Sequence, residues 1–232
     1  FAVDHPWLTL ARNAGVDTFG EADFASAFWR GKIVAVTGTN GKTTLVRFLT
    51  RLLNEAGRAA FAAGNVGKSF AELVSENPGE KSTAVLELSS FQTETLRMLR
   101  PDAVIWSNLD EDHLDRHGDL ASYFRAKARL IDRLGNGPFL AGISVPETSR
   151  VTGVSLSREP RVALREETEM VSLPEDSPFI TFPQRENLAL ALAFAEEEGI
   201  PGEIFNRVLV DFRGEPHRLE QVATIGKATF WN

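Results

Sequence analysis

The segment Thr37–Thr44, with the sequence Thr-Gly-Thr-Asn-Gly-Lys-Thr-Thr, constrains the fold of this chain more than any other. It follows an apolar, β-branched run, Lys32–Thr37, that is typical of a buried strand. A helical pattern then extends from Lys42 to Ala56, and Gly57 is well placed to end it in a left-handed cap. A strand, a glycine-rich turn and a helix in this order predict the opening unit of a parallel α/β fold.

The glycine-rich turn predicts a binding site for nucleotide phosphates. Gly38 and Gly41 let the backbone turn tightly with its N–H groups pointing inward, and the helix that begins at Lys42 directs its positive end at the same point. In such a loop the lysine reaches the β- and γ-phosphates, and the hydroxyl of Thr43 binds Mg²⁺. Val36 stands where the general pattern has its first glycine, so the alternative is a structural turn with an incidental lysine. The residues expected to bind the phosphates, called the phosphate loop below, are Gly38, Thr39, Asn40, Gly41, Lys42, Thr43 and Thr44.

The rest of the chain alternates short apolar runs with helical patterns. Further strands are expected at Arg58–Ala63, Thr83–Leu88 and Ala103–Asn108. Helices are expected at Ser69–Ser75, Leu120–Leu134, Glu186–Glu198 and Gly202–Val210. Strands that are apolar on both faces are typical of a mostly parallel sheet flanked by helices on both faces, which binds ligands at the carboxyl ends of its strands.

Two parts of the chain depart from this alternation. Between residues 142 and 183, several prolines and short alternating segments predict a small antiparallel excursion or a long irregular one. The segments are Val151–Leu156, Arg161–Arg165 and Met170–Leu173. Near the end, Leu219–Thr224 and Lys227–Trp231 indicate a hairpin around Gly226.

The composition excludes several classes of function. A net charge of −7 argues against a general nucleic-acid partner, because no surplus of lysine and arginine is available to neutralise phosphates. The absence of cysteine excludes a disulfide framework, a thiol nucleophile and a cysteine-liganded metal. No apolar run approaches the roughly 20 residues that span a bilayer, and no leader pattern is visible, so we expect a cytoplasmic protein with no membrane partner.

Acidic and histidine residues follow two of the expected strands. Glu87 ends one strand on the edge that carries the phosphate loop, which favours a metal-binding role over a structural one. After the next strand, His113 and His117 are four residues apart, a spacing that also occurs in zinc sites, but their carboxylate-rich surroundings favour Mg²⁺. We expect His113 to act beside Glu87 and His117 to lie in a solvated loop. On pattern alone, Lys127 is an exposed lysine of the helix at 120–134.

Taken together, these motifs resemble those of the Mur ligases, the family that builds the peptide of bacterial cell-wall precursors. The matching segments are Gly-Thr-Asn-Gly-Lys-Thr at 38–43, Asn-Val-Gly at 65–67, Glu-Leu-Ser-Ser-Phe-Gln at 87–92, Asn-Leu-x-x-Asp-His-Leu-Asp-Arg-His at 108–117 and Tyr-x-x-x-Lys at 123–127. The resemblance extends from residue 4 to residue 232, and the segment at 87–92 is similar to that of the members that add D-glutamate.

The resemblance implies an ATP site with two Mg²⁺ ions and a catalytic set of Lys42, Glu87, His113 and Lys127. Lys42 and Thr43 match the residues that bind the ATP phosphates and the first ion, whereas Glu87 and His113 match ligands of the second ion. Lys127 matches a lysine that the family carbamylates, which would place an anion beside the metal. Positions matching contacts to the muramoyl substrate are Asn65, Ser89 and Gln92. Positions matching nucleotide contacts are Asn187 and Arg218, whereas Pro183 and Gln184 depart from the family's adenine-side motif.

The reaction implied by the resemblance joins D-glutamate to UDP-N-acetylmuramoyl-L-alanine in peptidoglycan synthesis. The substrate carboxylate is phosphorylated by ATP, and the amine then attacks the acyl phosphate. The resemblance also implies that residues 1–30 are the tail of an N-terminal domain, 31–214 a central ATP-binding domain and 215–232 the start of a C-terminal domain. We expect a monomer in the bacterial cytoplasm, although nothing in the sequence sets the oligomeric state.

The sequence leaves three alternatives open. One is a sibling ligase that adds another amino acid, against which only the segment at 87–92 argues. Another is a small-molecule kinase with a phosphate loop, which would need an arginine-bearing lid that is not identifiable here. The third is a nucleotide-binding module without catalysis, which would have no use for a second metal site.

Overall fold

A parallel β-sheet forms the centre of the structure. The computed structural model describes residues 5–65, 67–77, 79–169, 171–180 and 183–213, together with the backbone of 221–225 and 228–231. Within these residues the central sheet has the strand order β2-β3-β1-β4-β5-β6, and each neighbouring pair is parallel. Its strands are β1 (Lys32–Thr37), β2 (Ala60–Gly64), β3 (Thr83–Glu87), β4 (Ala103–Trp106), β5 (Phe139–Ala141) and β6 (Arg161–Val162). The expected parallel α/β fold is confirmed, although β5 was not predicted.

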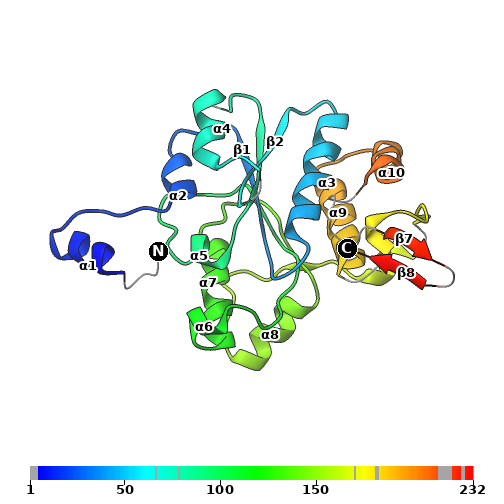
Figure 1. Cartoon of the computed structure of the whole chain (residues 1–232). Coiled ribbons are helices and arrows are strands. Elements are labelled where there is room, and N and C mark those ends of the chain that lie inside the picture. The colour runs from blue at the N-terminus through cyan, green and yellow to red at the C-terminus, as the bar shows by residue number, and fades with distance from the viewer. Residues whose placement is uncertain are drawn as a thin grey trace.

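Helices cover both faces of this sheet, as Figure 1 shows. On one face lie α3 (Lys42–Glu55), α9 (Gln184–Glu197) and α10 (Gly202–Asp211). On the other lie α2 (Glu21–Ala25), α4 (Phe70–Glu76), α7 (Leu120–Asp132) and α8 (Ser144–Thr152). Two one-turn helices, α5 (Ser90–Thr93) and α6 (Leu114–His117), follow β3 and β4 at the lower edge of the sheet in this view. The structure is therefore a three-layer sandwich.

The alternation of side chains along β1 explains why its sequence is apolar throughout. Val34 and Val36 belong to the core cluster under α3 and α9, whereas Ile33 and Ala35 belong to the cluster under α4 and α7. All of them are buried, because a central strand of a covered parallel sheet has no solvent-facing side.

The strand order brings the expected functional segments together at one edge. The connection from β1 to β2 runs over the face of α3, and the connections from β2 through β3 to β4 run over the opposite face. In open parallel sheets, ligands bind where the connections change face, here at the carboxyl end of β1. In the sheet register, Glu87 of β3 lies opposite Val36, and Trp106 of β4 lies opposite Thr37. The phosphate loop therefore emerges between the segments that follow β3 and β4.

The antiparallel excursion expected between residues 142 and 183 is wrong. The segment begins with helix α8, and β6 pairs in parallel with β5. Val151 lies on an exposed face of α8, so its alternation with polar residues reflects a surface helix rather than a strand. Beyond β6 the chain forms two 3₁₀ helices, η1 (Arg165–Thr168) and η2 (Pro178–Ile180), and Met170 lies outside the described residues.

The terminal elements lie at opposite sides of the sandwich in Figure 1. Helix α1 (Pro6–Asn13), which was not predicted, projects from the side that carries α2. The expected hairpin is confirmed in the backbone: β7 (Gln221–Ile225) and β8 (Ala228–Trp231) pair antiparallel, while Gly226 lies outside the described residues.

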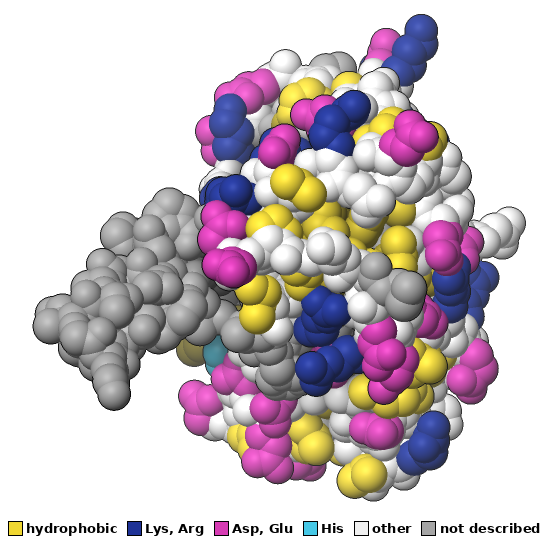
Figure 2. All heavy atoms as spheres, turned by 90° about the vertical axis from the view of Figure 1, so that its right-hand side faces the viewer, with side chains coloured by type: hydrophobic (Ala, Val, Ile, Leu, Met, Phe, Trp, Pro, Cys, Tyr) yellow, Lys and Arg dark blue, Asp and Glu magenta, His cyan; other side chains and the backbone are white. Residues whose placement is uncertain are grey.

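The surface of the described residues carries both signs of charge. Figure 2 shows lysine and arginine side chains scattered among acidic ones on the side that carries α10, without a continuous basic area. None of the helices in the described ranges is both long and apolar enough to cross a lipid bilayer.

The side chain of Asp23 ties helix α2 to the segment that precedes β4. Its carboxylate is buried and accepts hydrogen bonds from the backbone N–H groups of Arg97, Met98 and Leu99, at 2.8–2.9 Å. Asp17 binds the side chain of the same arginine at 3.0 Å, but on the exposed surface.

We expect Asp23→Ala to lower the free energy of unfolding by about 3 kcal/mol, because the mutation leaves backbone donors without their acceptor. Asp17→Ala, the matched control, should lower it by less than about 1 kcal/mol, since exposed ion pairs contribute little. Urea denaturation of both variants measures the difference. Equal losses would contradict a specific role for the buried carboxylate.

Candidate functional site

The phosphate loop has the backbone conformation that its glycines predict. Gly38 and Gly41 have φ angles of +151° and +77°, which L side chains rarely adopt. A Cβ atom on Gly38 would lie 2.0 Å from the Ser107 hydroxyl, and one on Gly41 would lie 2.3 Å from the Asn187 amide. Gly41 also caps the N-terminus of α3, whose positive end therefore faces the phosphate loop. Both glycines are required by conformation and by space.

Residues that follow β4 form hydrogen bonds with Asn40 of the phosphate loop. The side-chain amide of Asn108 accepts from the backbone N–H of Asn40 at 2.8 Å and donates to its carbonyl at 3.0 Å. The Ser107 hydroxyl donates to the same carbonyl at 3.1 Å. The sequence pattern did not predict this role of Ser107 and Asn108, although their place at the end of an expected strand was a signal for it.

Two further groups connect the phosphate loop to its surroundings. The Thr39 hydroxyl lies 3.2 Å from the Tyr123 hydroxyl on α7 and accepts from the backbone N–H of Asp110 at 3.0 Å. Burial raises the pKa of Tyr123 to about 12, so its hydroxyl keeps its proton at neutral pH.

The half-buried Lys42 donates from Nζ to the carbonyls of Gly38 and Thr39, at 3.1 and 2.9 Å. Its ammonium group therefore lies against the backbone carbonyls of the phosphate loop.

Glu87 is buried at the end of β3 and has partners on two other elements. Its Oε2 accepts from the Thr43 hydroxyl at 2.7 Å, and its Oε1 accepts from the Asn65 amide at 3.0 Å. The structure thus brings together three residues that were expected from separate motifs. The Thr43 hydroxyl and the Glu87 carboxylate are oxygen donors of the kind that suits Mg²⁺, whereas Asn65 directs its amide nitrogen at Glu87.

Lys127 is buried on α7, so the expectation from pattern alone of an exposed helical lysine is wrong. Its Nζ donates to the carbonyl of Gly38 at 2.8 Å and lies 4.8 Å from the centre of the Tyr123 ring. Burial, and then the nearby charge of Lys42, lower its pKa well below that of an ordinary lysine. The site therefore favours the neutral amine of Lys127.

The two histidines of the segment after β4 have opposite environments. The His113 side chain is 48% exposed, with Nε2 3.4 Å from the carboxylate of Asp112. The His117 side chain is only 4% exposed, and its Nε2 lies 3.0 Å from the Ser90 hydroxyl, so the expected solvated position is wrong. Burial is the main cause that lowers the pKa of His117.

The histidines do not form a zinc site with nearby carboxylates. Across the described ranges, no three histidine, aspartate or glutamate side chains converge closely enough to hold a metal ion. Nor does a hydrogen bond join His113 to Glu87; the His113 ring instead lies 5.0 Å from the ring of Phe91 and 6.5 Å from that of Tyr123. Since Lys127 lies over the same Tyr123 ring, His113 and Lys127 flank one aromatic side chain.

The expected substrate-binding residues lie beside Glu87. Ser89 and Gln92 cap α5 reciprocally: the backbone N–H of Gln92 donates to the Ser89 hydroxyl at 3.3 Å, and the backbone N–H of Ser89 donates to Gln92 Oε1 at 2.9 Å. Asn65 is exposed at the end of β2. The capping box makes α5 a rigid feature of this edge, and contact of these residues with a substrate stays a prediction.

Helix α9 reaches the phosphate loop through Asn187. The buried amide of Asn187 donates from Nδ2 to the carbonyl of Gly41 at 3.0 Å and to Gln184 Oε1 at 2.7 Å. Its Oδ1 is buried and has no hydrogen-bond partner in the described structure, so an acceptor is left beside the loop.

The remaining expected nucleotide-binding residues are Thr44 and Arg218. Thr44 is buried in the first turn of α3, and Arg218 lies outside the described residues, as does His217.

We expect Gly41→Ala to destabilise the chain more than Gly57→Ala. Both glycines have similar φ angles, +77° and +74°, so each substitution adds about 1 kcal/mol of backbone strain. Only the Cβ at position 41 meets another group, the Asn187 amide, so this variant should also lose nucleotide affinity. Urea denaturation and calorimetry with an ATP analogue measure both effects, and equal behaviour of the two variants would contradict the close contact between α9 and the loop.

Comparison with known sequences gives a consistent set of relatives. Residues 36–156, more than half of the chain, match the Mur ligase middle domain. UDP-N-acetylmuramoylalanine--D-glutamate ligase of Prochlorococcus marinus is 34% identical over 263 residues, an alignment that covers 100% of this chain and 55% of that protein. The protein of the same name from Aquifex aeolicus is 32% identical, with 98% and 56% covered. The chain therefore spans about half the length of the curated relatives it matches.

Solved structures share the fold at lower sequence identity. MurF from Acinetobacter baumannii superposes with a TM-score of 0.66 at 18% identity, covering 88% of this chain and 51% of that one. UDP-N-acetylmuramate-alanine ligase MurC from Thermotoga maritima gives a TM-score of 0.61 at 19% identity, covering 96% and 55%. Fold, loop geometry and sequence agree: this chain belongs to the Mur ligase family, whose middle domain it contains.

Proposed function

We propose that this chain is the ATP-binding part of a ligase that adds D-glutamate to UDP-N-acetylmuramoyl-L-alanine, in peptidoglycan precursor synthesis in the bacterial cytoplasm. The observation that carries the proposal is the contact of the phosphate loop with Glu87 through Thr43. In this proposal residues 31–214 are the central domain, flanked by the tail of an N-terminal domain and the start of a C-terminal one. We propose a monomer, with no nucleic-acid or membrane partner.

The geometry of the site suits ATP and Mg²⁺. The loop carbonyls hold the Lys42 ammonium where β- and γ-phosphates would lie, and the N-terminus of α3 adds backbone donors. We assign the first Mg²⁺ to Thr43 and the second to Glu87, His113 and Lys127. When bound, the ions neutralise charge on the transferred phosphoryl group. Asn187 and Arg218 are assigned to the nucleotide, and Asn65, Ser89 and Gln92 to the muramoyl substrate.

The chemistry of the ligase divides into two transfers. A carboxylate oxygen of the muramoyl substrate attacks the γ-phosphorus of ATP, and the bond to the β–γ bridging oxygen breaks, so ADP leaves. The amine of D-glutamate then attacks the acyl carbon, loses a proton and expels inorganic phosphate. Lys42 stabilises the charge of the first transfer by its position in the loop, and most of the acceleration in such reactions comes from positioning and charge.

The environment of Lys127 supports its carbamylation. A neutral amine adds to CO₂ through its nitrogen and loses a proton, which yields a carbamate with a net negative charge. The lowered pKa of Lys127 supplies the neutral amine, and burial shields the product from water. This step converts a neutral amine into an anionic carbamate whose oxygens would bind Mg²⁺.

The choice of D-glutamate rests on the curated relatives, which carry the name of that ligase. A sibling ligase that adds another amino acid is the second candidate, since the solved structures with this fold include such enzymes. A small-molecule kinase and a non-catalytic module are not favoured by relatives of this kind.

Phosphate release by the whole gene product tests the proposal, with ATP, Mg²⁺ and UDP-N-acetylmuramoyl-L-alanine present. We expect release that depends on D-glutamate and is absent with L-glutamate, lysine or diaminopimelate.

Lys42→Ala should lower the rate of phosphate release by at least about 100-fold, because the loop loses its charge at the phosphates. Release that depends on lysine or diaminopimelate would support the sibling ligase, and unchanged turnover of Lys42→Ala would sink the assignment of the phosphate loop.

Carbamylation of Lys127 is detectable by NMR in ¹³C-bicarbonate. We expect one carbamate signal that grows as pH rises through the lowered pKa of Lys127, because only the neutral amine reacts. Lys127→Arg should remove the signal. Lys68→Arg should retain it, since a hydrogen bond to Glu76 raises the pKa of that exposed lysine. A signal that survives in Lys127→Arg would refute the assignment.

A further inference from the structure

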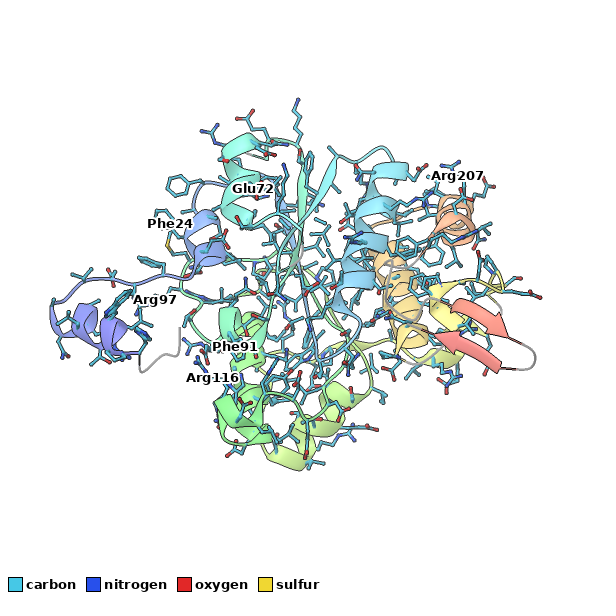
Figure 3. The ribbon with its side chains drawn as sticks, in the orientation of Figure 1. Phe24, Glu72, Phe91, Arg97, Arg116 and Arg207 are labelled. Carbon is cyan, nitrogen blue, oxygen red and sulfur yellow. The ribbon has the colours of Figure 1, made fainter. Side chains whose placement is uncertain are left out.

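The ring of Phe91 lies at the ligand-binding edge, and the chemistry above makes no use of it. Although Phe91 is 39% exposed, its ring has three close neighbours from the segment after β4. The Arg116 guanidinium lies 5.3 Å from the ring centre, the His117 ring stacks on it at 5.6 Å with 16° between planes, and the His113 ring lies 5.0 Å away. Figure 3 shows Phe91 and Arg116 next to each other at this edge.

Helix α6, which begins directly after His113, cannot hold its position alone. It has only four residues, none of them fully buried, and a single turn is unstable in water. His113 caps it with a φ of +51°, a left-handed conformation that costs a residue other than glycine about 1–2 kcal/mol. The position of His113 must therefore be fixed by contacts with other elements.

Helix α5 supplies such contacts along its length. Ser90 binds His117 through its hydroxyl, Phe91 contacts both histidines, and Glu94 forms an ion pair with Arg116. The capping box of Ser89 and Gln92 holds α5 itself in place. On α7, the Tyr123 ring also contacts α6, since it lies 5.3 Å from the ring of His117.

We propose that Phe91 is a positioning residue, which together with the Glu94–Arg116 ion pair holds α6 and thereby places His113 for metal binding. The inference rests on the proposed function, in which His113 is a ligand of the second Mg²⁺. The physical basis is the ring–ring contact with the histidines, whose geometry the charge distribution of the rings favours, and the attraction of the guanidinium to the ring face. Both need an aromatic ring rather than bulk alone. Leucine at this position keeps apolar volume but loses both interactions.

Phe91→Leu is therefore the informative variant, and Phe91→Tyr, which keeps the ring, is the conservative one. The chain offers a matched control in Phe19, which is 40% exposed and has the Arg97 guanidinium 5.7 Å from its ring centre. Arg97 lies away from Phe91, towards α1 in Figure 3. Phe19→Leu removes an equivalent aromatic–arginine contact outside the site.

The first measurement uses the chain without metal. The chain has four histidines, so ¹³C labelling of the histidine Cε1 gives four signals, and His113→Gln identifies that of His113. We expect Phe91→Leu to shift the His113 signal towards that of a free histidine, since the ring current of Phe91 is lost. Phe91→Tyr should restore the native position, and Phe19→Leu should leave it unchanged.

The second measurement adds Mn²⁺ as the probe metal, with a non-hydrolysable ATP analogue. Mn²⁺ should broaden the His113 signal of the native chain, and Phe91→Leu should weaken Mn²⁺ binding about 10-fold, the size of effect seen when the support of a metal ligand is removed. Glu94→Gln, which keeps every ring, should act in the same direction and serves where Phe91→Leu fails to fold.

The possible results separate the two proposals. An unchanged His113 signal and unchanged Mn²⁺ affinity in Phe91→Leu and Glu94→Gln would overturn the positioning role, as would equal effects in Phe19→Leu. If Mn²⁺ leaves His113 of the native chain sharp while Glu94→Gln, which keeps the Phe91 ring, still shifts its signal, the metal assignment fails and the placement of His113 by these contacts stands.

Discussion

The buried carboxylate of Glu87 is the group on which the arrangement of the ligand-binding edge depends. A carboxylate removed from water is stable only where donors or cations compensate its charge. Here the donors come from Thr43 in the first turn of α3 and from Asn65 after β2, so one side chain fixes three segments relative to each other. The fold delivers this arrangement through the sheet register, which sets Glu87 opposite Val36 at the start of the loop.

The phosphate loop is held from both sides before any ligand arrives. On one side Asn108 binds both backbone groups of Asn40, and on the other Asn187 binds the carbonyl of Gly41. A loop fixed in this way loses little conformational freedom when it binds phosphate, which favours affinity and accurate placement. The two glycines permit this conformation, and the side-chain amides of Asn108 and Asn187 stabilise it.

Sequence patterns predicted what depends on local structure and missed what depends on packing. The strand, turn and helix around Lys42 follow from glycine positions and apolar spacing, and the structure has them within a residue or two. The burial of Lys127 and His117 has no local signal, because each is covered by side chains from other elements. The segment Val151–Leu156 was mistaken for a strand because the exposed Val151, in the last turn of α8, mimics alternation.

Several features that weaken a fold lie together at this edge. The core clusters on either face of the sheet are apolar and closely packed, whereas the edge combines a buried lysine of lowered pKa, a buried carboxylate, an unpaired amide oxygen on Asn187 and a left-handed His113. Such features cost free energy of folding and are typical of functional sites, which fits the binding and catalysis proposed for this edge. Strained and charged groups keep their positions only where contacts with neighbouring elements hold them. The capped α5 and the ring of Phe91 supply such contacts at this edge.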